Sequence, residues 1–279
     1  AQFFRNELSS SYEKEEIENF IAYCFEDFIG YTKTDLLIKQ DKTVSESDLL
    51  KFHFAVKDLK RGRPIQYILG KTSFYGMEFM VNSNVLIPRP ETEELVKLIL
   101  DNAKSHAESF SILDVGTGSG CIAIALKKNL PRCHVYALDI SEEALKVAKE
   151  NALRNECEIH FIHGDIRDAG TVEKLPACTV IVSNPPYVKN SERSFMHENV
   201  VEHEPHLALF VPDEDELVFY KVIAEAGKLK LKSGGAVYVE INEALGIDTA
   251  ILFQKEGYTN VQLLQDMQGK DRMIQAEKK

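Results

Sequence analysis

Apolar residues recur at helical spacing through the first quarter of the chain. Two stretches carry them at intervals of three and four residues, the pattern of helices that bury one face. The first stretch holds Ile17, Phe20, Ile21, Cys24, Phe25 and Phe28, and the second Leu49, Leu50, Phe52, Phe54, Val56 and Leu59. Ser45 precedes the second stretch as a helix cap, and a Gly and a Pro end it at 62–64. The pattern predicts a small helical domain over residues 1–70, which carries no cofactor motif and which we expect to dock the substrate.

β-forming residues replace the helical pattern between residues 66 and 85. Aromatic and branched side chains cluster there between glycines, which predicts a β-hairpin linker over residues 71–90. Two prolines in the segment Ile-Pro-Arg-Pro then hold the backbone extended. Thr92 or Glu91 is suited to open the helix that includes residues 95–100.

After residue 109 the pattern alternates between short apolar strands and amphipathic helices. The predicted strands are 111–115, 134–138, 158–163, 179–183 and 236–241, and the predicted helices are 121–128, 141–154, 217–229 and 249–256. Strands that alternate with helices of this length indicate βαβ units around a parallel sheet. Residues 91–279 therefore read as one α/β domain.

Composition narrows the class of partner. Proteins that bind nucleic-acid backbones usually present a basic face, so a formal net charge of −11 favours a protein or small-molecule partner over a nucleic acid. Five cysteines without a Cys-x-x-Cys pair predict buried thiols, not disulfides or a zinc knuckle. The sequence shows no secretory leader and no apolar run of membrane-spanning length, so we expect a soluble, cytoplasmic protein with no membrane association.

A glycine-rich loop follows the first predicted strand of the α/β domain. Gly116, Gly118 and Gly120 alternate between the strand and the next helix, where glycine lets the backbone turn sharply and approach a ligand closely. Asp139 ends the next strand, 21 residues after Gly118, where a carboxylate can accept both ribose hydroxyls of an adenosine cofactor. A nicotinamide dinucleotide satisfies part of the same pattern, so the loop alone does not identify the cofactor.

The third predicted strand also ends on an acid. Asp165 follows His-Gly at the edge of the sheet where open α/β folds bind ligands. Asp165 or its neighbour Ile166 could flank an adenine ring. A solvated loop aspartate is nearly as good an interpretation.

The segment Asn-Pro-Pro-Tyr, residues 184–187, directly follows the fourth predicted strand. Its two prolines fix the backbone, so that the Asn184 side-chain oxygen and the Pro185 carbonyl can accept both hydrogens of one planar NH₂ group. Holding both N–H groups helps turn the nitrogen lone pair toward an electrophile, and Tyr187 can stack on the planar group. Methyl transfer from S-adenosylmethionine needs such a grip, whereas hydride transfer does not. The two motifs together therefore predict a methyltransferase that acts on an amide or amine nitrogen.

A histidine- and glutamate-rich segment over residues 197–206 could hold a metal by composition. It has no His-Glu-x-x-His motif, and a proline at 205 interrupts any helix that would align the ligands. We expect no metal there and predict a polar loop over the active site.

At these motifs the sequence resembles a known family, the bacterial and organellar methyltransferases that N5-methylate a glutamine of peptide-chain release factors. The resemblance covers nearly the whole chain and is carried by segments 64–70, 85–93, 113–120, 184–187, 204–209 and 269–272. Asn-Pro-Pro-Tyr alone is shared with adenine-N6 methyltransferases, whereas Ile-Pro-Arg-Pro-Glu-Thr-Glu at 87–93 is far more specific. One departure is Phe-Val-Pro-Asp at 210–213, where the family pattern has glycines.

The resemblance implies a five-helix N-terminal domain, a hairpin linker and a seven-stranded, Rossmann-like class I methyltransferase domain. It implies cofactor contacts from Gly116, Thr117, Gly118, Ser119, Gly120, Asp139, Asp165, Ile166 and Asn184. It also implies that Asn184, Pro185, Pro186 and Tyr187 hold the target glutamine of a Gly-Gly-Gln motif. The implied cofactor is S-adenosylmethionine, its product S-adenosylhomocysteine, and the implied partner a release factor.

Three competing hypotheses make different demands on the sequence. An adenine-N6 methyltransferase of DNA or RNA would carry a basic groove and usually an added target-recognition module, and neither is evident. A non-catalytic binding protein with a relic fold would show damage in the glycine loop or at Asn184, and both are intact. A nicotinamide dehydrogenase leaves Asn-Pro-Pro-Tyr unexplained.

Overall fold

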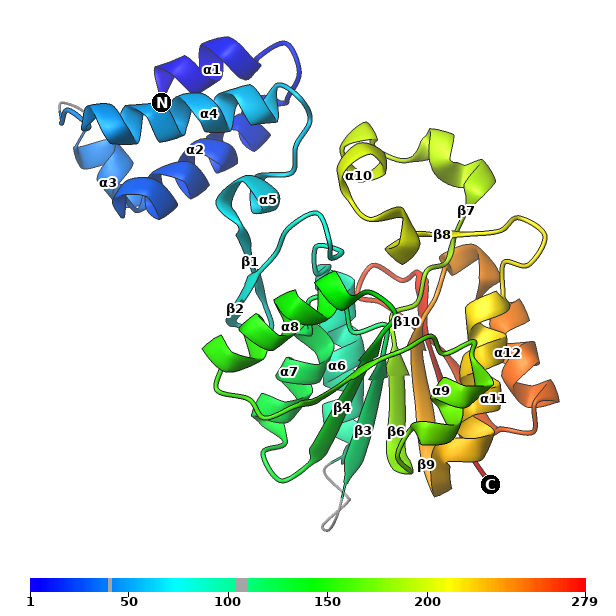
Figure 1. Ribbon diagram of the computed structural model, residues 1–279. Helices are drawn as coiled ribbons and strands as arrows, with labels where there is room; N and C mark the ends of the chain where they lie inside the picture. The colour runs from blue at the N-terminus through cyan, green and yellow to red at the C-terminus, as the bar shows by residue number, and fades with distance from the viewer. Residues whose placement is uncertain (40–41, 104–109) are drawn as a thin grey trace. The chain divides into compact units, whose positions relative to one another are not determined.

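The computed structural model describes residues 1–39, 42–103 and 110–279 (Figure 1). The chain forms two compact units. One consists of Ala1–Lys71 together with His197–His203, and the other of Thr72–Met196 together with Glu204–Lys279. Each unit has its own apolar core.

Helices make up the first unit. They are α1 (Gln2–Leu8), α2 (Lys14–Ile29), α3 (Lys33–Ile38), α4 (Glu46–Leu59), α5 (Ile65–Leu69) and α10 (Glu198–His203). Ser45 caps α4 by accepting a hydrogen bond from the Asp48 backbone N–H at 3.1 Å, as its sequence position predicts. Phe20 and Ile21 of α2 share one apolar core with Phe52 and Leu59 of α4, as predicted. The prediction was wrong for Leu49, Leu50 and Phe54, which are exposed.

The late segment of the chain contributes α10 to this same unit. His203 Nε2 lies 3.0 Å from the carbonyl oxygen of Arg61, and a Cβ added at Gly62 would lie 2.8 Å from Asn199 Oδ1. The predicted polar segment 197–206 is therefore divided: its helical part belongs with α1–α5, and its last residues belong with the second unit.

A seven-stranded sheet organises the second unit (Figure 1). Its order is β10-β11-β9-β6-β3-β4-β5, and every neighbouring pair is parallel except the two that involve β11. The strands are β3 (Ser111–Val115), β4 (His134–Asp139), β5 (His160–His163), β6 (Cys178–Ser183), β9 (Leu231–Glu240), β10 (Thr259–Gln265) and β11 (Asp271–Glu277). A hairpin of β1 (Lys71–Phe74) and β2 (Met77–Met80) and a short pair of β7 (Val188–Lys189) and β8 (Phe210–Val211) form separate sheets.

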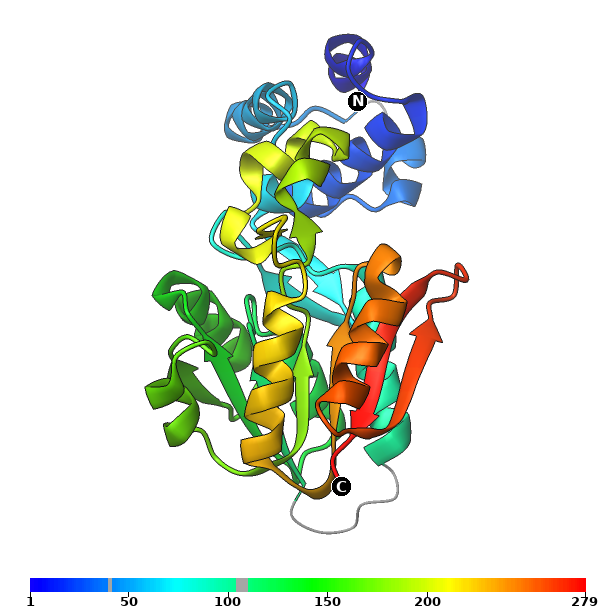
Figure 2. The same cartoon turned by 90° about the vertical axis from the view of Figure 1, so that its right-hand side faces the viewer.

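Helices cover both faces of the sheet, as Figures 1 and 2 show. Alternate strand residues point to opposite layers: Ile112 packs in the core with α6 and α7, whereas Leu113 packs in the core with α11 and α12. The covering helices are α6 (Pro90–Ala103), α7 (Cys121–Asn129), α8 (Glu142–Arg154), α9 (Ala169–Lys174), α11 (Val218–Lys230) and α12 (Gly246–Lys255). Because both faces are buried, the inner strands are almost continuously apolar.

Several helices and strands begin at other residues than the sequence predicted. Helix α6 begins at Pro90, because proline suits the first helical position, so Thr92 lies inside the first turn and does not open the helix. Strand β9 begins at Leu231, earlier than residue 236. Strands β10 and β11 were not among those predicted from the residues.

Four of the five cysteines are buried as expected, whereas Cys157 is half-buried. Among the helices of the described residues, none has both the length and the apolar character that a membrane span requires.

Candidate active site

A pocket opens at the carboxyl ends of β3, β4, β5 and β6. The chain order of the strands reverses beside β3, and open α/β sheets bind ligands at such a switch point. The pocket brings together most of the predicted site residues: Gly116, Thr117, Gly118, Ser119, Asp139, Asp165, Ile166, Asn184, Pro185 and Pro186. Gly120 and Tyr187 are not part of its lining.

The glycine loop forms one wall of the pocket. Gly116 and Gly118 have φ of +73° and +55°, a backbone conformation that residues with a Cβ rarely adopt. A Cβ at either position would meet no protein atom within 4 Å. Since both residues line the pocket, such a Cβ would take up space that a ligand can use. Gly120 has another role, because its Cβ would lie 3.1 Å from Ile124 and 3.2 Å from Ala148 beneath the loop.

Asp139 ends β4 and holds the glycine loop in place. Its Oδ2 accepts a hydrogen bond from the Gly118 backbone N–H at 2.8 Å, and its Oδ1 accepts one from the Ser141 N–H at 2.9 Å. Burial raises the pKa of the Asp139 carboxyl, and the backbone donors oppose that shift. A carboxylate offers about four lone pairs, so both oxygens keep capacity for a ligand's hydroxyl groups.

Asp165 and Ile166 follow β5 on the neighbouring wall. The Arg167 guanidinium pairs with both Asp165 carboxylate oxygens, with Nη2 2.7 Å from Oδ2, and holds the pKa of that carboxyl below its usual value. Arg167 in turn lies over the Phe219 ring, 5.6 Å from its centroid. The carboxylate is thus already engaged, and the apolar side chain of Ile166 is the better-placed surface for a flat ring.

Asn184, Pro185 and Pro186 follow β6, the neighbour of β3 in the sheet, and line the same pocket as the glycine loop. The Asn184 Nδ2 donates a hydrogen bond to Thr92 Oγ1 at 3.2 Å, which leaves the side-chain oxygen as its acceptor. The Tyr187 hydroxyl donates to Glu240 Oε1 at 3.1 Å, outside the pocket lining. Its ring is therefore anchored behind the pocket in this structure.

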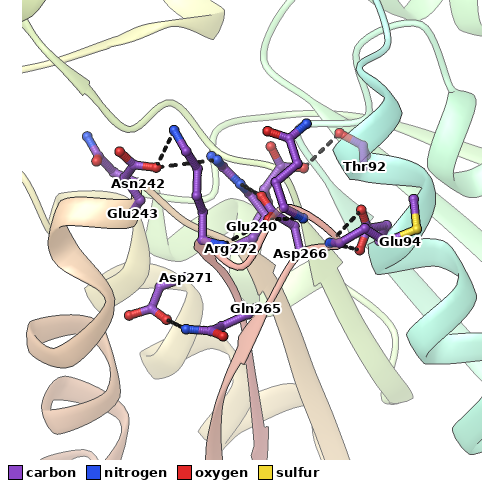
Figure 3. A network of polar contacts seen from close by, with 12 residues as sticks. Thr92, Glu94, Glu240, Asn242, Glu243, Gln265, Asp266, Asp271 and Arg272 are labelled. Carbon is purple, nitrogen blue, oxygen red and sulfur yellow. Dashed lines mark hydrogen bonds and ion pairs between the residues drawn. The ribbon is translucent and has the colours of Figure 1, made fainter.

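Sequence analysis gave no role in the site to two residues near Asn184: Thr92, which it named only as a helix-opening residue and which lines the pocket, and Glu240. Thr92 and Glu240 are each 2% exposed, and the Thr92 hydroxyl donates to Glu240 Oε2 at 2.7 Å (Figure 3). Burial raises the pKa of Glu240, whereas the Thr92 and Tyr187 donors and the Arg272 charge lower it. The available signal was an acid at the carboxyl end of a predicted strand, the same signal that identified Asp139.

Asp114 is a second buried acid that the sequence analysis did not single out. It is fully buried in β3, and Thr117 Oγ1 donates to its Oδ2 at 2.7 Å. Burial raises the pKa of Asp114 to about 7. This hydrogen bond ties the first turn of the glycine loop back to the strand.

Residues 85–93 and 204–209, two of the segments that carry the family resemblance, meet at the pocket. Glu204 is 4% exposed and accepts hydrogen bonds from Arg89 Nη2 at 2.5 Å and from the Ile87 N–H at 3.2 Å. Arg89, Pro205 and Leu207 all line the pocket. The end of the polar segment therefore contributes to the pocket wall, and among the described residues no group of three acidic, histidine or cysteine side chains could hold a metal.

The residues of the pocket fit an adenosine-type cofactor. The open space over Gly116 and Gly118 admits a close ligand, Asp139 offers acceptors for hydroxyl groups, and Ile166 offers an apolar surface. These three features come from three consecutive strands of the sheet and converge on one cavity.

Comparisons with known proteins agree with this geometry. The PrmC N-terminal domain family matches residues 2–70, and the methyltransferase small domain family matches residues 91–208. A methyltransferase structure from Pyrococcus furiosus superposes with a TM-score of 0.53 at 18% identity and covers 84% of this chain and 99% of its own. The seven-stranded, Rossmann-like class I methyltransferase fold is thereby confirmed.

Full-length relatives are closer in sequence. A release factor glutamine methyltransferase from Flavobacterium psychrophilum is 46% identical over 273 residues, which cover 97% of this chain and 95% of the relative. A second, from Bacteroides thetaiotaomicron, is 41% identical over 276 residues, which cover 99% and 98%. The family resemblance of the sequence is therefore confirmed, and the chain belongs to the release factor glutamine methyltransferase family.

Proposed function

We propose that this protein transfers a methyl group from S-adenosylmethionine to the side-chain amide nitrogen, N5, of the glutamine in the Gly-Gly-Gln motif of peptide-chain release factors. S-adenosylhomocysteine is the second product, and the modification tunes translation termination. The observation that carries the proposal is the common pocket: Asn184 and Pro185 lie in the same cavity as the glycine loop and Asp139.

On the cofactor side of the pocket, each wall would contact a different part of the cofactor. Asp139 would accept the ribose hydroxyls, the loop from Gly116 to Ser119 would lie against the amino-acid portion, and Ile166 would flank the adenine. When bound, the cofactor supplies a methyl group on a sulfonium. Asp165 supports this wall through its ion pair with Arg167.

The substrate side grips the amide. The Asn184 side-chain oxygen and the Pro185 carbonyl accept the two N–H hydrogens of the glutamine, and the Pro185–Pro186 pair fixes the direction of these acceptors. As the nitrogen lone pair leaves conjugation, it points to the methyl group. The methyl carbon would gain its bond to nitrogen as it loses its bond to sulfur, S-adenosylhomocysteine would leave, and one of the two N–H protons would pass to solvent. The main contribution of these residues is positioning. Tyr187 is the last residue of the Asn-Pro-Pro-Tyr segment, and its hydroxyl holds it in place by donating to Glu240.

A release factor is the expected partner, and the first unit is the expected docking domain because no pocket-lining residue comes from it. The net charge of −11 opposes approach to a polyanion. An adenine in a duplex must also be flipped out at a cost of a few kcal/mol, whereas an exposed Gly-Gly-Gln loop enters a narrow pocket directly.

The test is transfer of labelled methyl to four substrates in parallel: a release factor, its Gln→Ala variant, DNA and RNA. We expect labelling of the release factor alone. Labelling of nucleic acid would favour an adenine-N6 methyltransferase, and equal labelling of the Gln→Ala variant would contradict glutamine as the acceptor.

A further inference from the structure

We propose that Thr92 and Glu240 are positioning residues that hold the Asn184 side-chain amide with its nitrogen away from the pocket and its oxygen toward the methyl acceptor. The inference rests on the proposed function, since it concerns the same grip on the substrate NH₂ group. It adds two residues: Glu240 from β9, which is not part of the pocket lining, and Thr92 from α6, which lies at the pocket wall and acts here through its bond to Asn184.

The orientation of Asn184 decides whether the grip works. An asparagine amide has nearly the same shape when its oxygen and nitrogen are exchanged, but one orientation presents an acceptor and the other presents two donors. A substrate N–H needs the acceptor. With the amide reversed, Asn184 would place its own N–H groups against those of the substrate, and one of the two holding bonds would be lost.

Hydrogen-bond chemistry selects one orientation. A carboxylate only accepts, so Glu240 Oε2 takes the single hydroxyl proton of Thr92 across 2.7 Å. Thr92 Oγ1 then has only lone pairs to offer Asn184, and the partner at 3.2 Å must be the donor, Nδ2. The order of donors and acceptors runs from Asn184 through Thr92 to Glu240 and leaves Oδ1 free.

The Glu240 carboxylate, the last group in this series of hydrogen bonds, is itself held in place. Its other oxygen accepts the Tyr187 hydroxyl at 3.1 Å. Burial raises the pKa of Glu240, and the two hydroxyl donors and the nearby Arg272 charge oppose that shift. Arg272 is anchored in turn, because its Nε donates to Asp266 Oδ2 at 3.1 Å (Figure 3). Glu240 thus accepts from both sides, and its side chain is buried.

A simpler view is that these bonds only tie α6 to β9. If that view is right, Thr92→Val lowers the free energy of unfolding but changes neither kcat nor the exchange rate of the Asn184 side-chain NH₂ group. The chain offers a matched control: Thr249 is fully buried in α12 and its hydroxyl donates to the Leu245 carbonyl at 2.8 Å. Thr249→Val makes the same chemical change at a similar depth, far from Asn184 in sequence and outside the pocket lining.

The first measurement is turnover of release factor by the full-length enzyme. We expect Thr92→Val to lower kcat about tenfold, the effect of one lost hydrogen bond of about 1.4 kcal/mol, with cofactor affinity changed less than about twofold. Thr92→Ser, which keeps the hydroxyl, should recover most of kcat. Thr249→Val should lower the unfolding midpoint without lowering kcat.

The second measurement needs no activity. In ¹⁵N-labelled protein the Asn184 side-chain NH₂ signal, assigned by its absence from Asn184→Asp, should exchange slowly with water because Thr92 holds it. Exchange should become at least about tenfold faster in Thr92→Val and also faster in Glu240→Gln, because a glutamine can donate to Thr92 and release the fixed order.

The outcomes separate the two proposals. A wild-type enzyme that fails to methylate release factors contradicts the proposed function, and the exchange measurement then still decides the orientation of Asn184. If Thr92→Val keeps wild-type kcat and slow exchange and loses only stability, as Thr249→Val does, Thr92 is a structural tether and the positioning role is excluded. Failure of Thr92→Ser to restore kcat excludes it as well.

Discussion

The guanidinium of Arg89 donates a hydrogen bond to the buried carboxylate of Glu204 and so joins two pocket segments that lie 115 residues apart in the chain. Glu204 also accepts the Ile87 backbone N–H. Arg89 and Glu204 belong to the segments Ile-Pro-Arg-Pro-Glu-Thr-Glu and Glu-Pro-His-Leu-Ala-Leu. Each contributes one half of an ion pair, and the pair fixes a wall of the pocket.

Replacing Arg89 alone should lower the free energy of unfolding more than replacing both Arg89 and Glu204. Arg89→Met leaves a carboxylate buried without its cation, which typically costs about 3–5 kcal/mol in a fully buried pair. The Arg89 side chain is 33% exposed, so we expect a smaller loss, about 1–3 kcal/mol. Adding Glu204→Gln should recover at least about 1 kcal/mol. Chemical unfolding of the two single variants and the double variant measures this coupling, and additive losses would show that the two residues are not coupled.

Asn184→Ala should abolish most turnover and leave the cofactor affinity nearly unchanged. Loss of one preorganised polar contact to the reacting group typically lowers the rate by about 10²–10³. Asn129→Ala is a suitable control, because Asn129 is exposed at the end of α7 and bonds only to the Ala125 carbonyl in the interactions described. Single-turnover rates with saturating cofactor distinguish the variants. Wild-type rates in Asn184→Ala would refute the NH₂ grip.

Asp139→Ala should weaken cofactor binding at least tenfold in a protein that still folds. Hydrogen bonds to a charged group contribute about 1.5–3 kcal/mol each, and the variant also leaves the Gly118 N–H without its acceptor. Asp248→Ala, at an exposed position in α12, should have no effect. Calorimetric titration with S-adenosylhomocysteine gives the affinities, and an unchanged value for Asp139→Ala would remove this residue from the site.

Local sequence patterns predicted the parts of the fold that local burial determines. The strand 111–115 is β3 residue for residue, because both of its faces are covered and all five positions are buried. The edge strand β10 was missed because it alternates half-buried and exposed residues and includes polar Thr259 and Asn260. A half-exposed polar strand has no apolar run that separates it from a loop.

The same distinction holds at the site. Gly116, Gly118 and Asn184 stand out because each lies in a short motif whose chemistry is complete within a few residues. Thr92 and Glu240 are 148 residues apart, and their bond exists only because α6 packs beside the end of β9. Topology brings such partners together, so a pattern along the chain can mark Glu240 as an acid at the end of a strand but cannot predict its bond to Thr92.

Asp114 gives the fold a pH dependence with a definite sign. The unfolded chain loses this proton near pH 3.8, whereas burial delays its loss in the folded protein to about pH 7. Between these values the folded state holds more protons than the unfolded state, so the contribution of Asp114 to stability falls as pH rises. Each pH unit corresponds to about 1.4 kcal/mol, and the effect levels off above the folded pKa.

Asp114→Asn removes this titration and keeps an oxygen that accepts the Thr117 hydroxyl. The free energy of unfolding of Asp114→Asn, minus that of the wild type, should therefore increase from pH 4 to pH 7 and then remain constant. The comparison requires cofactor-free protein, since a ligand bound only to the folded state would add its own linkage. A difference that stays flat from pH 4 to pH 7 would mean that Asp114 ionises in the folded protein as it does in the unfolded chain, and that burial is offset by the bond from Thr117.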